Sequence, residues 1–155
     1  MRFLLKMYNM LRSIEKTVME QSAKNPYLIS IGQRAEIVSM IFKQRQKDTK
    51  ETLEDIKDII EDMNTAEKER AAKKMSSEIF SVYWTLRTEG LNNAENVAKD
   101  TNEVFGEYPY WKNNSEQERK LKGELYKILI KNKVLMKKAV EIGSKILNDL
   151  KRAEK

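Results

Sequence analysis

The sequence predicts an all-α protein, a single domain of about six to seven helices joined as antiparallel hairpins. Charged residues make up 35% of the 155 residues and hydrophobic residues 40%, with only 5 Gly and 2 Pro. That composition favours helix over sheet. Apolar residues also recur three and four positions apart along most of the chain, the spacing of one helix face. The length is sufficient for one domain, residues 1–155, with a buried core.

The first helix is expected over residues 2–23, where Asn25-Pro26 follows as a stop signal. Its apolar stripe consists of Leu4, Met7, Leu11, Ile14 and Val18. This helical spacing of apolar residues is already established at residue 3, and no capping residue precedes it. We therefore expect the chain to be a C-terminal fragment of a larger subunit.

The second helix is expected from about Tyr27 to Lys47, followed at once by a third. Asp48 is the expected N-cap of the third helix, and Glu51 stands three residues on, the spacing of a capping box. The one or two residues between these helices favour an antiparallel hairpin. The apolar stripe fades after Met63, so residues 64–74 are expected to form a solvated helix end.

Four more segments complete the pattern. A short, strongly apolar helix follows Ser76-Ser77 and closes at Gly90, a residue typical of the position after a helix. Asn93 is the expected cap of the next helix. A second capping box, Ser115 with Glu118, predicts a helix that buries Leu121, Leu125, Ile128 and Leu129. A kink or break is expected at residues 131–134, before a last helix whose stripe is Leu135, Ala139, Ile142, Ile146 and Leu150.

The composition excludes several kinds of active site. The chain has no Cys and no His, so thiolate zinc sites, disulfides and histidine bases are ruled out. No phosphate-binding glycine loop is present. Four carboxylates of the third helix, Asp55, Asp58, Glu61 and Asp62, are of a type that suits Mg²⁺, but solvated surface is their more frequent role. Acidic-x-Lys triplets at residues 48–50, 55–57 and 118–120 are expected by chance. We predict no catalytic residue, no metal and no cofactor.

No apolar run of about 18 residues exists to cross a membrane. The N-terminal segment begins like a signal peptide, but Lys6, Asn9 and Arg12 interrupt its apolar run. We expect a cytoplasmic protein that has no membrane partner.

The basic excess lies in the C-terminal helices. Residues 1–111 hold 17 Lys and Arg against 18 Asp and Glu, a net charge of −1, whereas residues 112–155 hold 13 against 6, a net charge of +7. A basic stripe along the helix after Ser115 could follow a phosphodiester backbone. Its candidate DNA-binding residues are Arg119, Lys120, Lys127, Lys131 and Lys133. The alternative is that Glu116–Lys120 and Glu118–Lys122 are ordinary surface pairs.

Two aromatic segments allow two interpretations each. Tyr108, Tyr110 and Trp111 could stack on unpaired bases, but an aromatic cluster beside Pro109 more often fills the core between helices. The segment FSVYWTLR, residues 80–87, is favoured as a core helix over an interface.

Several of these segments together resemble the C-terminal helical region of the motor subunits (HsdR) of type I restriction enzymes. The matching residues are Arg34-Ala35-Glu36, Gln44-Arg45-Gln46, Phe80 to Trp84, Trp111, and Leu125 to Leu129. The resemblance runs from about residue 25 to 131 and rests on structural rather than catalytic positions.

The resemblance implies a non-catalytic assembly module. In that family the tail docks an ATP-dependent motor and nuclease onto the modification (methyltransferase) and specificity subunits, and DNA is a further partner. The nuclease and ATPase motifs are not found in these 155 residues, so no catalytic residue carries over. The alternative is a free-standing helical nucleic-acid-binding protein. An enzyme with a carboxylate-bridged metal is a second rival, disfavoured by the lack of histidine.

Overall fold

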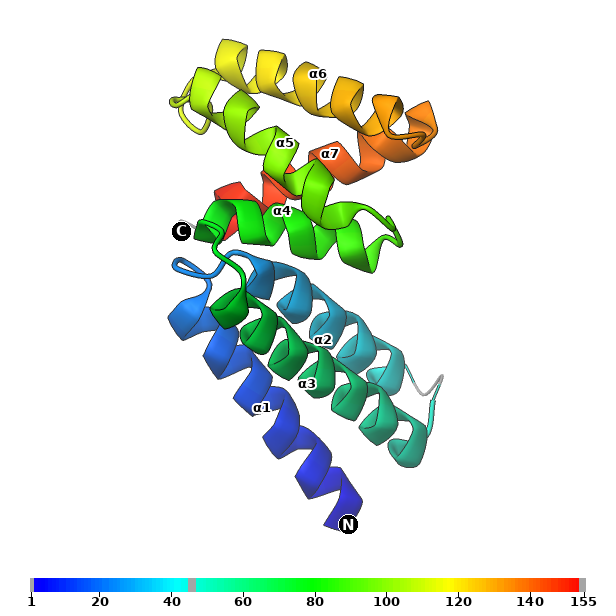
Figure 1. Cartoon of the computed structure of the whole chain (residues 1–155). Helices are drawn as coiled ribbons and strands as arrows, with labels where there is room; N and C mark the ends of the chain where they lie inside the picture. The colour runs from blue at the N-terminus through cyan, green and yellow to red at the C-terminus, as the bar shows by residue number, and fades with distance from the viewer. Residues whose placement is uncertain (1, 45–46, 154–155) are drawn as a thin grey trace. The chain divides into compact units, whose positions relative to one another are not determined.

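The computed structural model describes residues 2–44 and 47–153, and the described residues form seven α-helices and no β-strand (Figure 1). The all-α prediction is therefore confirmed. The helices are α1 (Arg2–Gln21), α2 (Tyr27–Lys43), α3 (Thr49–Ala72), α4 (Ser77–Thr88), α5 (Ala94–Glu107), α6 (Ser115–Lys131) and α7 (Met136–Ala153). They gather into two compact units, Met1–Lys74 and Met75–Lys155. The single domain expected over residues 1–155 stays a prediction.

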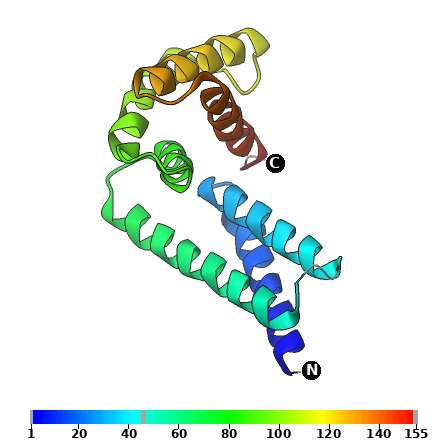
Figure 2. The same cartoon turned by 90° about the vertical axis from the view of Figure 1, so that its right-hand side faces the viewer.

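The first unit is a three-helix bundle in which each helix contacts the other two. Figures 1 and 2 both show α1, α2 and α3 side by side, with short connections between them. Each helix contributes a stripe that is almost fully buried, because apolar residues three and four apart share one face. The core includes Met7, Leu11, Ile14, Leu28, Ile31, Leu53, Ile56 and Ile59.

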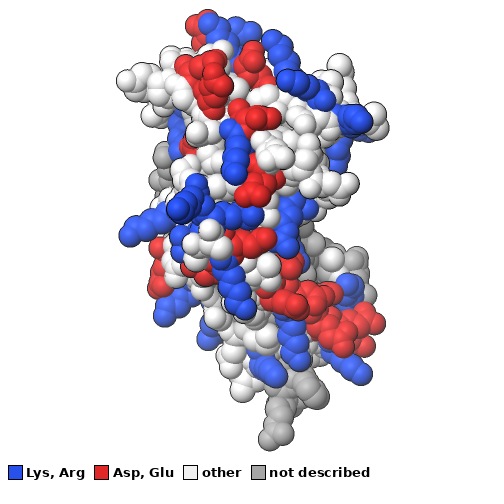
Figure 3. Space-filling model, viewed as in Figure 1, with Lys and Arg blue, Asp and Glu red and all other residues white. Residues whose placement is uncertain are grey.

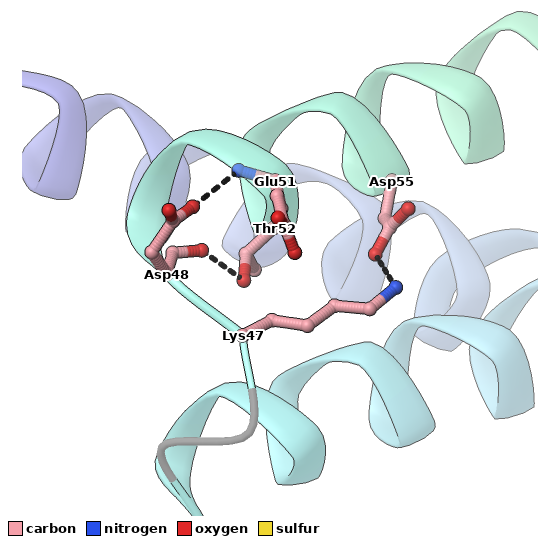
Figure 4. Close-up of polar contacts among 5 residues, drawn as sticks. All are labelled: Lys47, Asp48, Glu51, Thr52 and Asp55. Atoms are coloured by element: carbon pink, nitrogen blue, oxygen red, sulfur yellow. Dashed lines mark hydrogen bonds and ion pairs between the residues drawn. The ribbon is translucent and has the colours of Figure 1, made fainter.

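The start of α3 follows the sequence prediction. The Asp48 carboxylate accepts a hydrogen bond from the Glu51 amide at 2.8 Å, so Asp48 is the N-cap (Figure 4). The Thr52 hydroxyl donates to the Asp48 carbonyl at 2.8 Å, and the Lys47 ammonium pairs with Asp55 at 2.8 Å. In contrast, α2 ends at Lys43, earlier than predicted.

The far end of α3 is solvated over most of its surface, as expected, but it also has a buried face that the sequence did not show. Ala66 has no exposed surface, and the Tyr27 hydroxyl donates to the Glu67 carboxylate at 3.1 Å. Alanine and the stem of a polar residue can pack against a neighbouring helix where the sequence shows no large apolar residue. The core face of α3 therefore continues beyond Met63.

The second unit is a closed ring of four helices. Its α4 contacts α5 and α7, and α6 also contacts α5 and α7. Eight consecutive residues of α4, from Ile79 to Leu86, are buried. The core interpretation is therefore confirmed for residues 80–86, whereas Arg87 is exposed. The other inward residues include Val97, Phe105, Leu121, Leu125, Leu129, Ile142, Ile146 and Leu147.

The helix ends of this unit were partly predicted. Gly90 has a positive φ of 88°, and its amide donates to the Arg87 carbonyl, while the Leu91 amide donates to Leu86. This pair of bonds is a Schellman motif, as its glycine indicated. The N-cap of α6 is Asn114, whose side-chain oxygen accepts from two amides at 3.1 Å. The predicted capping box starting at Ser115 is therefore wrong by one residue.

The expected break at residues 131–134 is a tight turn between α6 and α7. Lys133 adopts the left-handed conformation at φ 70°. Its amide donates to Ile130, and the Val134 amide donates to Leu129, both at 3.0 Å, so a second Schellman motif closes α6. Leu135, expected in the buried stripe of α7, is 81% exposed, because the inward face of α7 begins only at Ala139.

Candidate functional site

Three of the basic residues predicted on α6 lie along one exposed face of the helix. Lys120, Lys127 and Lys131 are all exposed, and their spacing of seven and four places them on one face of the helix. Arg119 is also exposed, about 100° around the helix from Lys120. Lys133 is exposed in the turn that follows the helix.

The same stripe also carries acidic side chains. Glu116 lies 3.5 Å from Lys120, and Glu124 lies 3.2 Å from Lys127. The interpretation of Glu116–Lys120 as a surface pair is therefore confirmed. Glu124 was overlooked, although its position four residues after Lys120 was visible in the sequence. Positive and negative charges thus alternate along most of the stripe.

Glu118 has a different partner from the one expected. It pairs with Lys151 of α7 rather than with Lys122, four residues on in its own helix. The contact joins the first turn of α6 to the last turn of α7, and only the tertiary fold brings these turns together. Sequence spacing could not have indicated it.

The positive charge without acidic partners is concentrated where α6 ends. Among the described residues, no ion pair involves Lys131, Lys133 or Lys137. The adjacent Lys138 pairs with Glu89 at 2.8 Å and Glu141 at 3.9 Å, and the hydrogen bond to Glu89 raises the Lys138 pKa above its ordinary value. On the face drawn in Figure 3, basic and uncharged side chains cover this end of α6. This end of α6 can therefore attract an anionic group.

The aromatic corner divides between core and surface. Trp111 is 3% exposed and meets Phe105 edge-on at 6.1 Å between ring centroids, so the core prediction is confirmed for it. Tyr108 is half-buried. Tyr110 is 69% exposed, and its amide donates to the Gln117 side chain at 2.9 Å. Only Tyr110 of the three presents most of its ring to solvent, where it could stack on a base.

Two of the four candidate carboxylates of α3 take part in ion pairs. Asp62 accepts from Arg34 at 2.7 Å, and Asp55 is held by Lys47, as Figure 4 shows. A lysine or arginine within hydrogen-bond reach competes with a cation for the same oxygens. Within residues 2–44 and 47–153, no three acidic side chains are grouped so that they could hold a metal ion. The acidic-x-Lys triplets at 48–50, 55–57 and 118–120 all lie in or at the start of helices.

An apolar groove along α1 is a feature that sequence reasoning did not locate. Its lining combines α1 residues with one residue of α3: Leu5, Lys6, Asn9, Met10, Ser13 and Ile60. Leu5 is 64% exposed and the neighbouring Tyr8 is 45% exposed. The signal available in the sequence was that α1 has more apolar residues than one stripe requires. Leu5 and Tyr8 therefore add exposed apolar surface along this groove.

A scan against protein-family models gave no match, and neither did searches of the curated proteins and of the solved structures. Of the matching positions in the resemblance, Arg45 and Gln46 lie outside the described residues. None of the helices in the part of the chain that the structure describes has the length and apolar content needed to cross a bilayer.

Proposed function

We propose that the protein is a non-catalytic assembly module that docks onto the modification and specificity subunits of a type I restriction system. The observation that carries the proposal is the apolar groove along α1, with Leu5 at its edge. A groove of this kind accepts a helix or loop of another protein better than it accepts a polar small molecule. The resemblance to motor subunits supplies the identity of the partner.

The docking proposal is tested by co-purification of the full chain with the modification and specificity subunits encoded in the same genome. Wild-type protein is expected to be retained on the tagged complex, and Leu5→Asp to lose most of that retention, because a charge in the groove must be desolvated on binding. Ile37→Asp, at a residue of α2 that is 53% exposed, is the matched control and is expected to be retained. Absence of wild-type binding under native conditions would contradict the proposal.

A second candidate function is contact with the DNA backbone, as in the alternative of a free-standing nucleic-acid-binding protein. It is favoured by the exposed Arg119, Lys131 and Lys133, for which the described residues provide no acidic partner. Lys120 and Lys127 are weaker candidates for a phosphate contact, because they already have glutamate partners. Releasing a lysine from its partner reduces the gain from a phosphate contact.

A duplex DNA titration at two salt concentrations tests this function. Affinity is expected to fall as salt rises, with a log–log slope of about −0.9 for each phosphate neutralised. Lys131→Ala with Lys133→Ala is expected to reduce that slope more than Lys120→Ala with Lys127→Ala. If no binding is detected at low salt, DNA contact by this chain is excluded.

A further inference from the structure

The turn between α6 and α7 exposes an unusual number of large apolar side chains. Leu135 is 81% exposed, Met136 70%, Ile130 43% and Val140 41%. Met136 and Val140 stand four residues apart and share one face of α7, and Leu135 immediately precedes that helix. We name these four residues, with Lys131, Lys133 and Lys137, the α6–α7 tip.

The backbone of the tip is held in place by contacts within its own unit. The Schellman bonds fix the turn, although the left-handed backbone at Lys133 is unfavourable for a non-glycine residue. The Asn93 side-chain amide donates to the Asn132 side chain at 3.0 Å, and Asn132 donates to the Ile128 carbonyl at 2.8 Å. Lys138 ties the first turn of α7 to Glu89. A surface fixed in this way loses little conformational entropy when a partner binds.

The charge of the tip is complementary to an acidic partner. Lys131, Lys133 and Lys137 lie among the exposed apolar residues, and the nearby acids Glu89 and Glu141 are occupied by Lys138. A DNA backbone would satisfy the lysines but leave Leu135 and Met136 against phosphate. An anionic membrane usually needs a cluster of about four to eight basic residues, and the tip offers three without partners.

We propose that the α6–α7 tip binds an amphipathic helix of a partner protein. The apolar face of that helix covers Leu135, Met136 and Val140, and Asp or Glu residues beside that face reach Lys131 and Lys137. Helices that meet in this way use residues at spacings of three and four, the spacing of Met136 and Val140. The inference rests on the proposed assembly function only for the identity of the protein that carries the helix.

The test measures fluorescence anisotropy of a labelled synthetic peptide, helical and amphipathic, with Leu on one face and Glu beside it. The intact chain is expected to bind this peptide and to reject a peptide with Lys in place of each Glu. The variants Leu135→Ser with Met136→Ser, and Lys131→Glu with Lys137→Glu, are each expected to weaken binding about tenfold or more. Met19→Ser, at an 84% exposed methionine of α1, is the control and is expected to bind as wild type.

Because the substituted side chains are exposed, circular dichroism melting should show all variants folded. The proposal is overturned if the acidic peptide fails to bind, if both peptides bind equally, or if the tip variants bind as well as wild type. It is also overturned if duplex DNA or phosphatidylserine vesicles bind the wild-type chain, lose binding in the tip variants, and the acidic peptide does not bind. Retention by the modification and specificity subunits is scored separately, so failure of the docking proposal does not alter the peptide result.

Discussion

Tyr27 shows how the environment of one residue couples stability to pH. The side chain is 3% exposed, and its hydroxyl donates to the Glu67 carboxylate, which Arg70 also holds at 2.6 Å. Burial, with a contribution from the negative charge of Glu67, raises the Tyr27 pKa from 10.0 to about 12. The Arg70 hydrogen bond lowers the pKa of Glu67. Both shifts favour the protonation states found near neutral pH.

The raised pKa predicts a loss of stability in alkali. The folded protein favours the neutral phenol, so this contribution is complete below pH 10 and is lost as the pH rises toward 12. Between pH 8 and 11 the loss is roughly 1 kcal/mol. Urea unfolding of wild type and of Tyr27→Phe at pH 8 and at pH 11 isolates the contribution of the Tyr27 phenol, because Phe has no proton to lose. A stability difference between the two proteins that stays constant would contradict the prediction.

At the scale of the helix, two glycines have opposite structural roles. A Cβ atom on Gly143 of α7 would lie 2.7 Å and 2.9 Å from two carbons of the Tyr126 ring, whereas a Cβ on Gly123 of α6 would meet nothing within 4 Å. The Tyr126 hydroxyl also hydrogen-bonds the Ser144 hydroxyl at 3.1 Å. Gly143 therefore permits the close approach of α6 and α7, and Gly123 has no such contact.

Substitution by alanine should separate these roles. Gly123→Ala is expected to stabilise the protein by about 1 kcal/mol, the difference in helix propensity. Gly143→Ala is expected to destabilise it by about 1 kcal/mol, because displacing the Tyr126 ring outweighs the same propensity gain. The urea midpoints of Gly123→Ala and Gly143→Ala, compared with wild type, measure the two stability changes. In a Tyr126→Ala background the cost of Gly143→Ala should shrink, and an unchanged cost would show that the ring is not the obstacle.

Element boundaries were predictable where one residue type specifies a backbone conformation. Asp48 and Gly90 were located correctly, because an N-cap and a left-handed C-terminal residue have strong sequence preferences. Asn114 was missed because Ser115 offered an equally good cap one residue later. Asn93 stands before α5 as predicted, but its side chain bonds Asn132 instead of capping the helix. That partner, 39 residues away, could be known only from the fold.

For the molecule as a whole, the helical spacing of apolar residues predicted the all-α class, because seven such segments leave no stretch of chain for a β-sheet. It did not predict the grouping of the helices into two compact units, because stripes reveal what is buried but not against which helix. The candidate site was predictable in part. The sequence located five exposed basic residues and the pairing of Lys120 with Glu116, but not the pairing of Glu118 with Lys151, which only the fold brings together. The exposure of Leu135 was likewise hidden, since its spacing fits the stripe.

The ring of helices in the second unit has a consequence for synthesis on the ribosome. The contact between α4 and α7 joins the first and last helices of that unit, so the ring cannot close until α7 has left the exit tunnel. In the meantime α4, with eight consecutive residues that are buried in the finished fold, lacks α7 as a cover. All three helices of the bundle precede α4 in the chain, so the bundle can fold without α4. Nascent chains arrested between α6 and α7 should therefore expose the apolar surface of α4 and be the form that chaperones bind.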